Sequence, residues 1–367
     1  MTSVVVGHNP GTNTTVEAPD DLDQFQDWAI AARWSDGMAV IPPTPERVER
    51  MLEGTDHDRS TSLGAVPPRM ALATVEAVAA NAVMAGCRPT AMPVLIAATE
   101  AMLVPEVNAW GAQPTTHPCA LMLMVSGPVA RHAGIHSGAG LFGASLPGNV
   151  SIGRAMRLIQ QNVGGAYPGD VDRATQGTPA KISFCFAENE ERNPWAPYRV
   201  SQGFDEADSV VTVTFAEGPH NINDHVSKEP KGLALIFADT VMSLAKNNTY
   251  VRDSDYVIAI CPEHADIFAR AGWDRSDLQE YLHERARVPY GIWKQGGMPG
   301  VNPMPKYYEA ADDDLGLRIT DRKEDVHVVV AGGPGLHSAF IPTFGLTRTT
   351  SRVVCTALGT PARFPAA

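Results

Sequence analysis

The sequence predicts an internally duplicated α/β protein made of two strand-helix halves related by a pseudo-twofold axis. Strand-like apolar runs alternate with helix-like segments in both halves, which is typical of α/β folds. A strand with a glycine turn at residues 324–345 recurs in weaker form at 121–143, about two hundred residues earlier. Upstream of these, Ala-Gly-Cys at 85–87 resembles Ala-Gly-Trp at 271–273, each followed by a helix-like stretch. Two matches in the same order favour duplication.

Each copy of the repeated segment is an apolar run that leads into glycine, proline and then a histidine-serine pair. The later copy carries His337 and Ser338, and the earlier copy carries His136 and Ser137. Glycine lets a chain turn sharply or approach a ligand closely, and a helix that starts there offers free N–H groups to an anion. We therefore expect these four side chains to orient a substrate. The alternative is that each histidine only caps the backbone of an ordinary turn.

Composition indicates a folded protein and argues against several partners. With 367 residues, 44% hydrophobic and 19% charged, the chain suits two domains of ordinary size. Its formal net charge of -12 disfavours nucleic acid and anionic membrane surfaces, which recruit basic faces. The sequence contains no apolar run long enough for a spanning helix and no signal-like start. Five cysteines without a C-x-x-C pair indicate a reducing compartment, so we expect a cytoplasmic protein.

The predicted organisation has three parts. Residues 1–35 form a polar N-terminal arm, 36–165 the first α/β repeat, and 166–367 the second. Glycine and proline make 288–315 a lid-like loop, although an ordinary surface insertion fits equally well. We expect a homo-oligomer, and packing of the arm on a partner subunit is left open by the sequence.

Local patterns predict the elements in order. Residues 38–41 form a strand, and Thr44 caps a helix from Pro45 to Glu53 that ends at Gly54. The alanine-rich segment from Ala73 to Leu103 forms two helices broken at 86–89. Further strands are expected at 121–125, 181–186, 209–215, 256–260 and 328–330, and further helices at 149–161, 232–246 and 276–287.

The densest polar cluster lies between Glu217 and His225. His220, Asp224 and His225 have the chemistry of proton-transfer groups or metal ligands, because imidazole exchanges protons near neutral pH and a carboxylate can fix its tautomer. A spacing of five residues does not place two histidines on one helix face, so a site here needs a loop. A divalent metal ion is possible, but no standard zinc spacing is present. The alternative is a hydrogen-bonded turn.

Other candidates are singled out by position. Cys87 follows a helix break beside Arg88, where a lowered pKa would make a nucleophile, although buried inert cysteine is the common alternative. Arg154 lies early in a helix near the first glycine turn and could clamp a carboxylate or phosphate, and the alternative is a solvent-facing arginine on an amphipathic helix. His117 and Glu188 flank strands on the expected active side.

Four segments resemble a bacterial family described as thioredoxin-like or associated with the UGSC (seleno)protein motif. They are residues 42–48, 80–89, 185–190 and 218–225, and the resemblance extends from about residue 38 to the end. The chain has no Cys-Gly-Ser-Cys segment to stand for that motif. The resemblance therefore does not imply a redox role, and it implies no specific activity.

These observations predict an enzyme of lyase, hydratase or hydrolase type that performs acid–base, possibly metal-assisted, chemistry on a small polar or anionic substrate between the halves. His220, Asp224 and His225 would transfer protons or bind metal. Two alternatives remain open. One is a thiol-based oxidoreductase or transferase that uses Cys87, and the other is a non-enzymatic ligand-binding or assembly protein.

Overall fold

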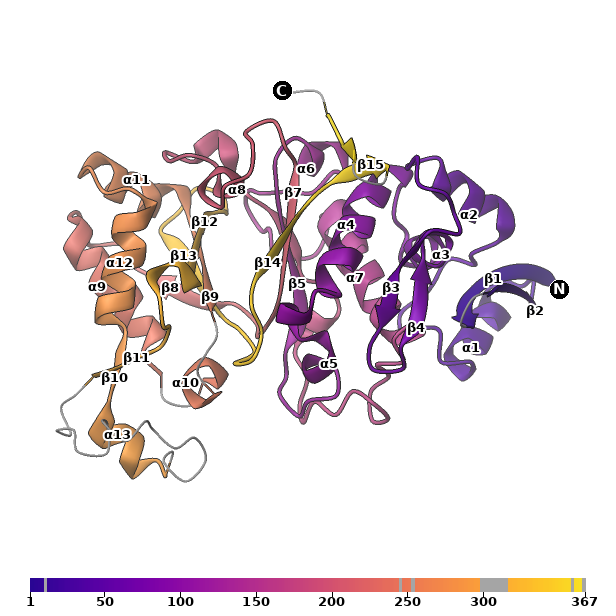
Figure 1. The fold of residues 1–367 in the computed structure, drawn as a ribbon, viewed down its shortest axis with the longest axis horizontal. Helices are drawn as coiled ribbons and strands as arrows, with labels where there is room; N and C mark the ends of the chain where they lie inside the picture. The colour runs from indigo at the N-terminus through magenta and orange to yellow at the C-terminus, as the bar shows by residue number, and fades with distance from the viewer. Residues whose placement is uncertain (10–11, 244–245, 252–254, 298–315, 358–359, 365–367) are drawn as a thin grey trace.

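The computed structural model describes residues 1–9, 12–243, 246–251, 255–297, 316–357 and 360–364. Two four-stranded mixed sheets pack face to face, and helices cover the outer face of each (Figure 1). The predicted α/β class is thus confirmed. In Figure 1 the layers run from α9 and α12 at one end, across both sheets, to α4 and α7 and then to the N-terminal hairpin.

The two sheets share one strand pattern. The first has the order β6-β5-β7-β14 and the second has the order β12-β9-β13-β8. In each, the first pair is parallel and the other two pairs are antiparallel. The strand that follows β7 in the chain joins the second sheet, and the strand that follows β13 joins the first. The bounds are β5 Ala120–Ser126, β6 Cys185–Ala187, β7 Val210–Ala216, β14 Thr350–Val353, β8 His220–Asn223, β9 Tyr256–Ile260, β12 Val326–Val330 and β13 His337–Pro342.

Alternating side chains build three cores, because successive residues of a strand point to opposite faces. In β5, Leu121 and Leu123 face the helices, whereas Met122 and Met124 face the second sheet. Strands buried on both faces read as continuous apolar runs. This is why the sequence identified β5, β7, β9 and β12 from composition alone.

Helices complete the outer layers. On the first sheet lie α4 (Met92–Met102) and α7 (Pro147–Asn162), with α3 (Val75–Ala85) packed beyond them and buried along its whole length. On the second lie α9 (Pro230–Val241), α11 (Pro262–Arg270) and α12 (Arg275–Arg285). The predicted break after α3 is confirmed, since Gly86 adopts a left-handed φ of 80° as the C-cap. Shorter elements are α5 Ala109–Ala112, α6 Val129–His132, α8 Tyr198–Ser201, α10 Asn247–Val251, α13 Tyr290–Gln295, β10 Arg287–Pro289, β11 Gly316–Arg318, β15 Cys355–Ala357 and β16 Thr360–Pro361.

The N-terminal region differs from the predicted arm. It forms a hairpin of β1 (Thr2–Asn9) and β2 (Thr12–Ala18) and then helix α1 (Leu22–Ala31). Val4, Ala18 and Phe25 are fully buried in the core of the first sheet. The apolar residues are too few for a core of their own but suffice to extend a neighbouring one. Helix α2 (Pro45–Leu52) follows as predicted, and β3 (Ser62–Val66) pairs with β4 (Ala71–Thr74).

Three further expectations can be compared with the structure. Residues 38–41 form no strand, because Val40 bonds to the side chain of Gln26 instead of joining a ladder. The first sheet draws β5 from the range 36–165 and its other three strands from 166–367, so it combines both predicted repeats. Of the lid-like loop, 298–315 lies outside the described residues.

The helices of the described residues are short or bent. None of them alone has the length and apolar character needed to cross a bilayer, although the bent pair Pro89–Met102 and Pro105–Ala112 would qualify by length and composition.

Candidate functional site

A pocket of about 420 Å³ lies on the face of the second sheet that is turned toward the first. It is lined by the later predicted glycine turn and by residues 139–143 at the end of the earlier copy. The turn after β12, residues 332–335, packs on the loop 139–143 that follows β5. The N–H of Gly332 donates to the carbonyl of Ser137 at 2.8 Å. A Cβ on Gly333 would come within 2.6 Å of the Ala139 Cβ, so only glycine permits this approach. The two matched segments therefore meet at one pocket.

His337 is the titratable side chain that lines this pocket. It begins β13 and pairs in register with Asn223 of β8. Its Nδ1 lies 3.0 Å from Oδ1 of Asn221, and its Nε2 lies 3.2 Å from Nε2 of His225. Since the amide oxygen can only accept, Nδ1 carries the proton and Nε2 keeps a lone pair. The His225 Nε2–H then donates to that lone pair.

Behind His337 lies a second, buried histidine that the sequence analysis missed. The Ser338 hydroxyl lies 2.8 Å from Nδ1 of His264, whose Nε2 lies 3.0 Å from the carbonyl oxygen of Asp224. The carbonyl requires a proton on Nε2, so Ser338 donates to Nδ1, while it accepts the N–H of Cys261 at 3.0 Å. Burial lowers the pKa of His264, which favours this neutral form. Ser338 is among the residues that line the pocket, and its hydroxyl is held by Cys261 and His264.

The sheet register places the His220 side chain outside the site. His220 pairs with Phe340, and Ile222 pairs with Ser338. Directly paired residues share a sheet face, and Phe340 and Ile222 both belong to the core on the helix side. His220 therefore faces away from the pocket that Asn221 lines. The predicted partnership of His220 with His225 is wrong, because strand alternation separates them.

Asp224 supports the site as an anchor and not as a proton donor. Its Oδ1 accepts the N–H groups of Val226 and Ser227 at 2.8 and 2.9 Å. Burial raises the pKa of Asp224, but the hydrogen bonds from Ser227 and Val226 outweigh burial, and the pKa is lowered overall. The charged carboxylate holds the segment that carries His225.

His136 and Ser137 shape the loop beside the pocket. The exposed His136 ring lies 3.2 Å from the carbonyl of Ala139 through Nε2, and its backbone is held at both ends by the side chain of Asn149. Ser137 contributes the carbonyl that accepts Gly332 N–H. Neither side chain is among the residues that line the pocket.

Three other candidates lie elsewhere. Arg154 is buried and makes a two-point ion pair with Asp36, 2.7 Å for each contact, so the predicted anion clamp is wrong and this arginine anchors residues 36–39. Glu188 is 4% exposed in a network with Ser126 and Arg275. His117 bonds through Nε2 to Oε1 of Glu217 at 2.8 Å and stacks on Phe344. These partners engage side chains that the sequence placed near substrate.

Cys87 lines a separate pocket of about 410 Å³ together with Arg47 and Arg50. Burial raises the pKa of its thiol to about 12, and the hydrogen bond with Ser151 and the charge of Arg154 offset this only in part. A thiol with such a pKa is protonated at neutral pH, and the thiolate is the nucleophile.

We expect iodoacetamide to alkylate Cys87 of the native protein at least tenfold more slowly at neutral pH than it alkylates the unfolded chain. Mass spectrometry of labelled peptides over time measures both rates, with the half-buried Cys355 as an internal reference. Fast labelling of Cys87 would restore the thiol-based alternative.

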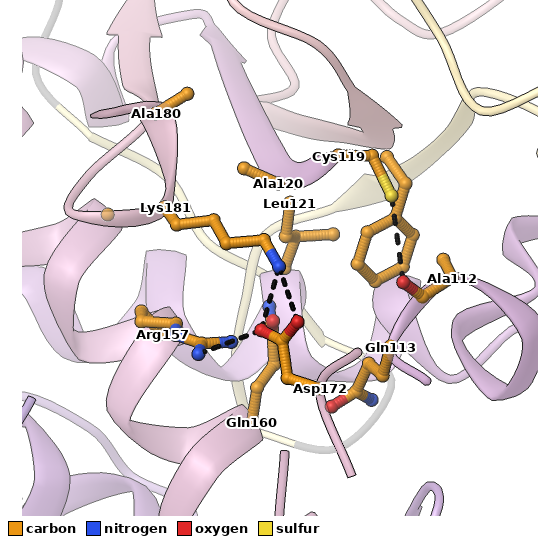
Figure 2. Close-up of a pocket in the computed structure, with 12 residues that line it drawn as sticks. Ala112, Gln113, Cys119, Ala120, Leu121, Arg157, Gln160, Asp172, Ala180 and Lys181 are labelled. Atoms are coloured by element: carbon orange, nitrogen blue, oxygen red, sulfur yellow. Dashed lines mark hydrogen bonds and ion pairs between the residues drawn. The ribbon is translucent and has the colours of Figure 1, made fainter. Parts of the chain in front are cut away.

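A third cavity is small and is lined by charged side chains. Figure 2 shows Asp172 between Lys181 and Arg157, with Oδ2 2.7 Å from Lys181 Nζ and 3.1 Å from Arg157 Nη2. The cavity volume is about 20 Å³, which suits a single water molecule. This cluster is therefore an internal ion network.

Within the described part of the chain, no group of three or more histidine, cysteine, aspartate or glutamate side chains is arranged to hold a metal ion. His225 and His337 form the one histidine pair joined by a ring-to-ring contact among the hydrogen bonds described.

Comparison with known proteins gives no match to a protein-family model, a curated protein or a solved structure. The resemblance to the UGSC-associated family stays a prediction, and the site is interpreted from its own geometry.

Proposed function

We propose that the protein is an enzyme of lyase, hydratase or hydrolase type that performs acid–base chemistry on a small polar or anionic substrate in the pocket between the sheets. The observation that carries this proposal is the His225–His337 contact of 3.2 Å at a pocket of about 420 Å³. His337 is oriented by Asn221, as a general base is oriented in known catalytic sites.

The pocket lining favours an anion. No aspartate or glutamate lines it within the described residues. The backbone N–H groups of Gly333 and Gly335 donate no hydrogen bond to another described residue. Free amides and a histidine pair suit a carboxylate or a similar oxyanion.

Proton transfer would use His337 Nε2 as the base. A substrate C–H or a water O–H gives its proton to Nε2, and the resulting imidazolium keeps its Nδ1–H bond to Asn221. The same proton returns to the leaving group or product. The cycle needs no oxidant or reductant, and the His225 Nε2–H gives up its hydrogen bond to His337 Nε2 when that nitrogen takes the proton of the substrate.

We also propose that the two halves arose by duplication. The matched order and direction of the strands support this idea, with β5 equivalent to β9 and the fourth strands exchanged between sheets. The sequence match at 121–143 and 324–345 instead equates β5 with β12, a central strand with an edge strand. The sheet topology therefore pairs β5 with β9 as equivalent strands, whereas the sequence match pairs β5 with β12.

Deuterium exchange tests the proposed function without a known product. We would incubate the protein in D₂O with small hydroxy-, keto- and amino-carboxylates and follow C–H exchange, water addition and water loss by proton NMR. Wild type is expected to convert or exchange at least one of them, and His337→Ala to lower the rate by about 10²–10⁴-fold. His220→Ala, on the opposite face of β8, should stay within about twofold of wild type. Equal rates for His337→Ala and wild type would remove the proposal, and binding without exchange would favour the ligand-binding alternative.

A further inference from the structure

The two imidazole rings at the pocket are placed to share a metal ion as well as a proton. We propose that His225 and His337 together bind a divalent transition-metal ion, with Zn²⁺ as the reference ion, through their two Nε2 atoms. The inference rests on the same pocket as the proposed function and assigns the histidine pair a second ligand.

The separation of the nitrogens suits a shared ion. The two Nε2 atoms lie 3.2 Å apart. An ion about 2.05 Å from each nitrogen would make an N–metal–N angle of roughly 100°. That angle falls between the ~90° of octahedral and the ~109° of tetrahedral coordination.

The ring positions give an independent check. Bonds of about 1.35 Å place each nitrogen roughly 1.15 Å from its ring centroid. Two rings in a straight N–H···N contact would then have centroids about 5.5 Å apart, whereas two rings aimed at a common ion would have them about 5.0 Å apart. The observed centroids are 5.0 Å apart, and the ring planes are inclined by 73°. The observed centroid distance agrees with the value for two rings aimed at a common ion.

The surroundings meet two further requirements. A metal-binding histidine usually donates its other N–H to an oxygen that fixes the ring, and Asn221 accepts from Nδ1 of His337 at 3.0 Å. Imidazole nitrogen is a preferred ligand of Zn²⁺, Cu²⁺ and Ni²⁺. With two protein ligands, the remaining positions would be taken by water or by an anionic substrate in the pocket. Such a site should bind more weakly than a structural site with four protein ligands.

A bound ion would occupy the lone pair of His337 Nε2, so the ion would replace that nitrogen as the activating group of the pocket. A divalent cation polarises a carbonyl or lowers the pKa of its own water, which would add Lewis-acid assistance to a pocket with no carboxylate in its described lining. Protons and metal would compete for the same nitrogens, so affinity should fall as the pH falls.

Calorimetric titration of the chelator-stripped full chain with Zn²⁺, up to about 1 mM, tests the inference. Wild type should bind one equivalent. His225→Ala and His337→Ala should each weaken binding at least tenfold, and Asn221→Ala should weaken it by about 10–100-fold. His220→Ala is the matched control and should bind as wild type does. Circular dichroism verifies that each variant is folded, which the exposed positions of His225 and His337 favour.

Saturation by one equivalent in wild type and in His220→Ala, together with loss in the two pocket variants, would establish the site. Absence of saturable binding, or equal binding by all variants, would overturn it. The exchange assay with and without chelator separates this inference from the proposed function. Exchange that depends on His337 without any zinc binding would retain the proposed function and reject the metal site. Zinc binding without any exchange would retain the metal site and reject the proposed function.

Discussion

Replacing Asp172 with alanine is expected to lower the free energy of unfolding by about 3–5 kcal/mol, because the change leaves two neighbouring cations without their counter-charge. The Asp172 side chain is 5% exposed, and those of Arg157 and Lys181 are 12% and 18% exposed. The carboxylate receives Lys181 Nζ at 2.8 and 2.7 Å and Arg157 Nη2 at 3.1 Å (Figure 2). Both cations are mostly buried, so solvent replaces the lost partner only in part.

Urea unfolding at neutral pH measures this effect, and Asp170→Ala is the matched control. Asp170 lies two residues away and pairs with Arg33 and Arg69 at the surface, where all three side chains are largely solvated. Exposed pairs contribute about 0–1 kcal/mol. If the two variants lose similar stability, the cluster at Asp172 is solvated and the buried-network interpretation is wrong.

Local signals were sufficient for several of the sheet and helix elements. The strand predicted at 256–260 has those bounds in the structure, and Gly86 ends α3 where the sequence placed a break. Such features depend on apolar content and backbone preference over a few residues, both of which can be read directly from the chain.

The composition of the pocket depended on register and could be predicted only in part. The glycine turns near His136 and His337 were identified because their residue types are unusual. Whether His220 or Asn221 faces the pocket depends on how β8 pairs with β13, since a shift of one residue exchanges the two faces of a strand. No local pattern specifies that pairing.

Ion-pair partners that lie far apart in the chain also could not be predicted from the sequence. Arg154 was interpreted as a substrate clamp from its place near a glycine turn, yet its partner Asp36 lies 118 residues earlier. The same applies to His264 of α11. Its partner Ser338 lies at the start of β13, and its partner Asp224 follows the end of β8. A charged or polar residue near a predicted cleft has a partner that only the tertiary structure identifies.

Glu188 should make stability fall as the pH rises from about 4.5 to about 7. Burial raises the pKa of its carboxyl to about 7 from the ordinary value of 4.5, and the Ser126 hydrogen bond and the Arg275 charge oppose this without cancelling it. Between these values the folded protein holds a proton at Glu188 that the unfolded chain has released. Linkage then requires the free energy of unfolding to decrease with pH in this window, by up to about 3 kcal/mol in total.

Comparison of wild type with Glu188→Gln isolates this contribution from other titrating groups. Glutamine can still accept from the backbone N–H of Tyr198, now 2.7 Å from Oε1 of Glu188, but it has no proton to lose. Urea unfolding between about pH 4.5 and 7.5 gives the free energy of unfolding of wild type minus that of the variant, and this difference should decline steadily as the pH rises. The control is Glu191→Gln, where the glutamate side chain is 82% exposed and the difference should not change with pH. A difference that increases with pH would mean that Arg275, 3.7 Å away, and the hydrogen-bond donors stabilise the carboxylate more than burial penalises it. Glu188 would then be a permanent anion between the sheets, and Arg275 would be its required counter-charge.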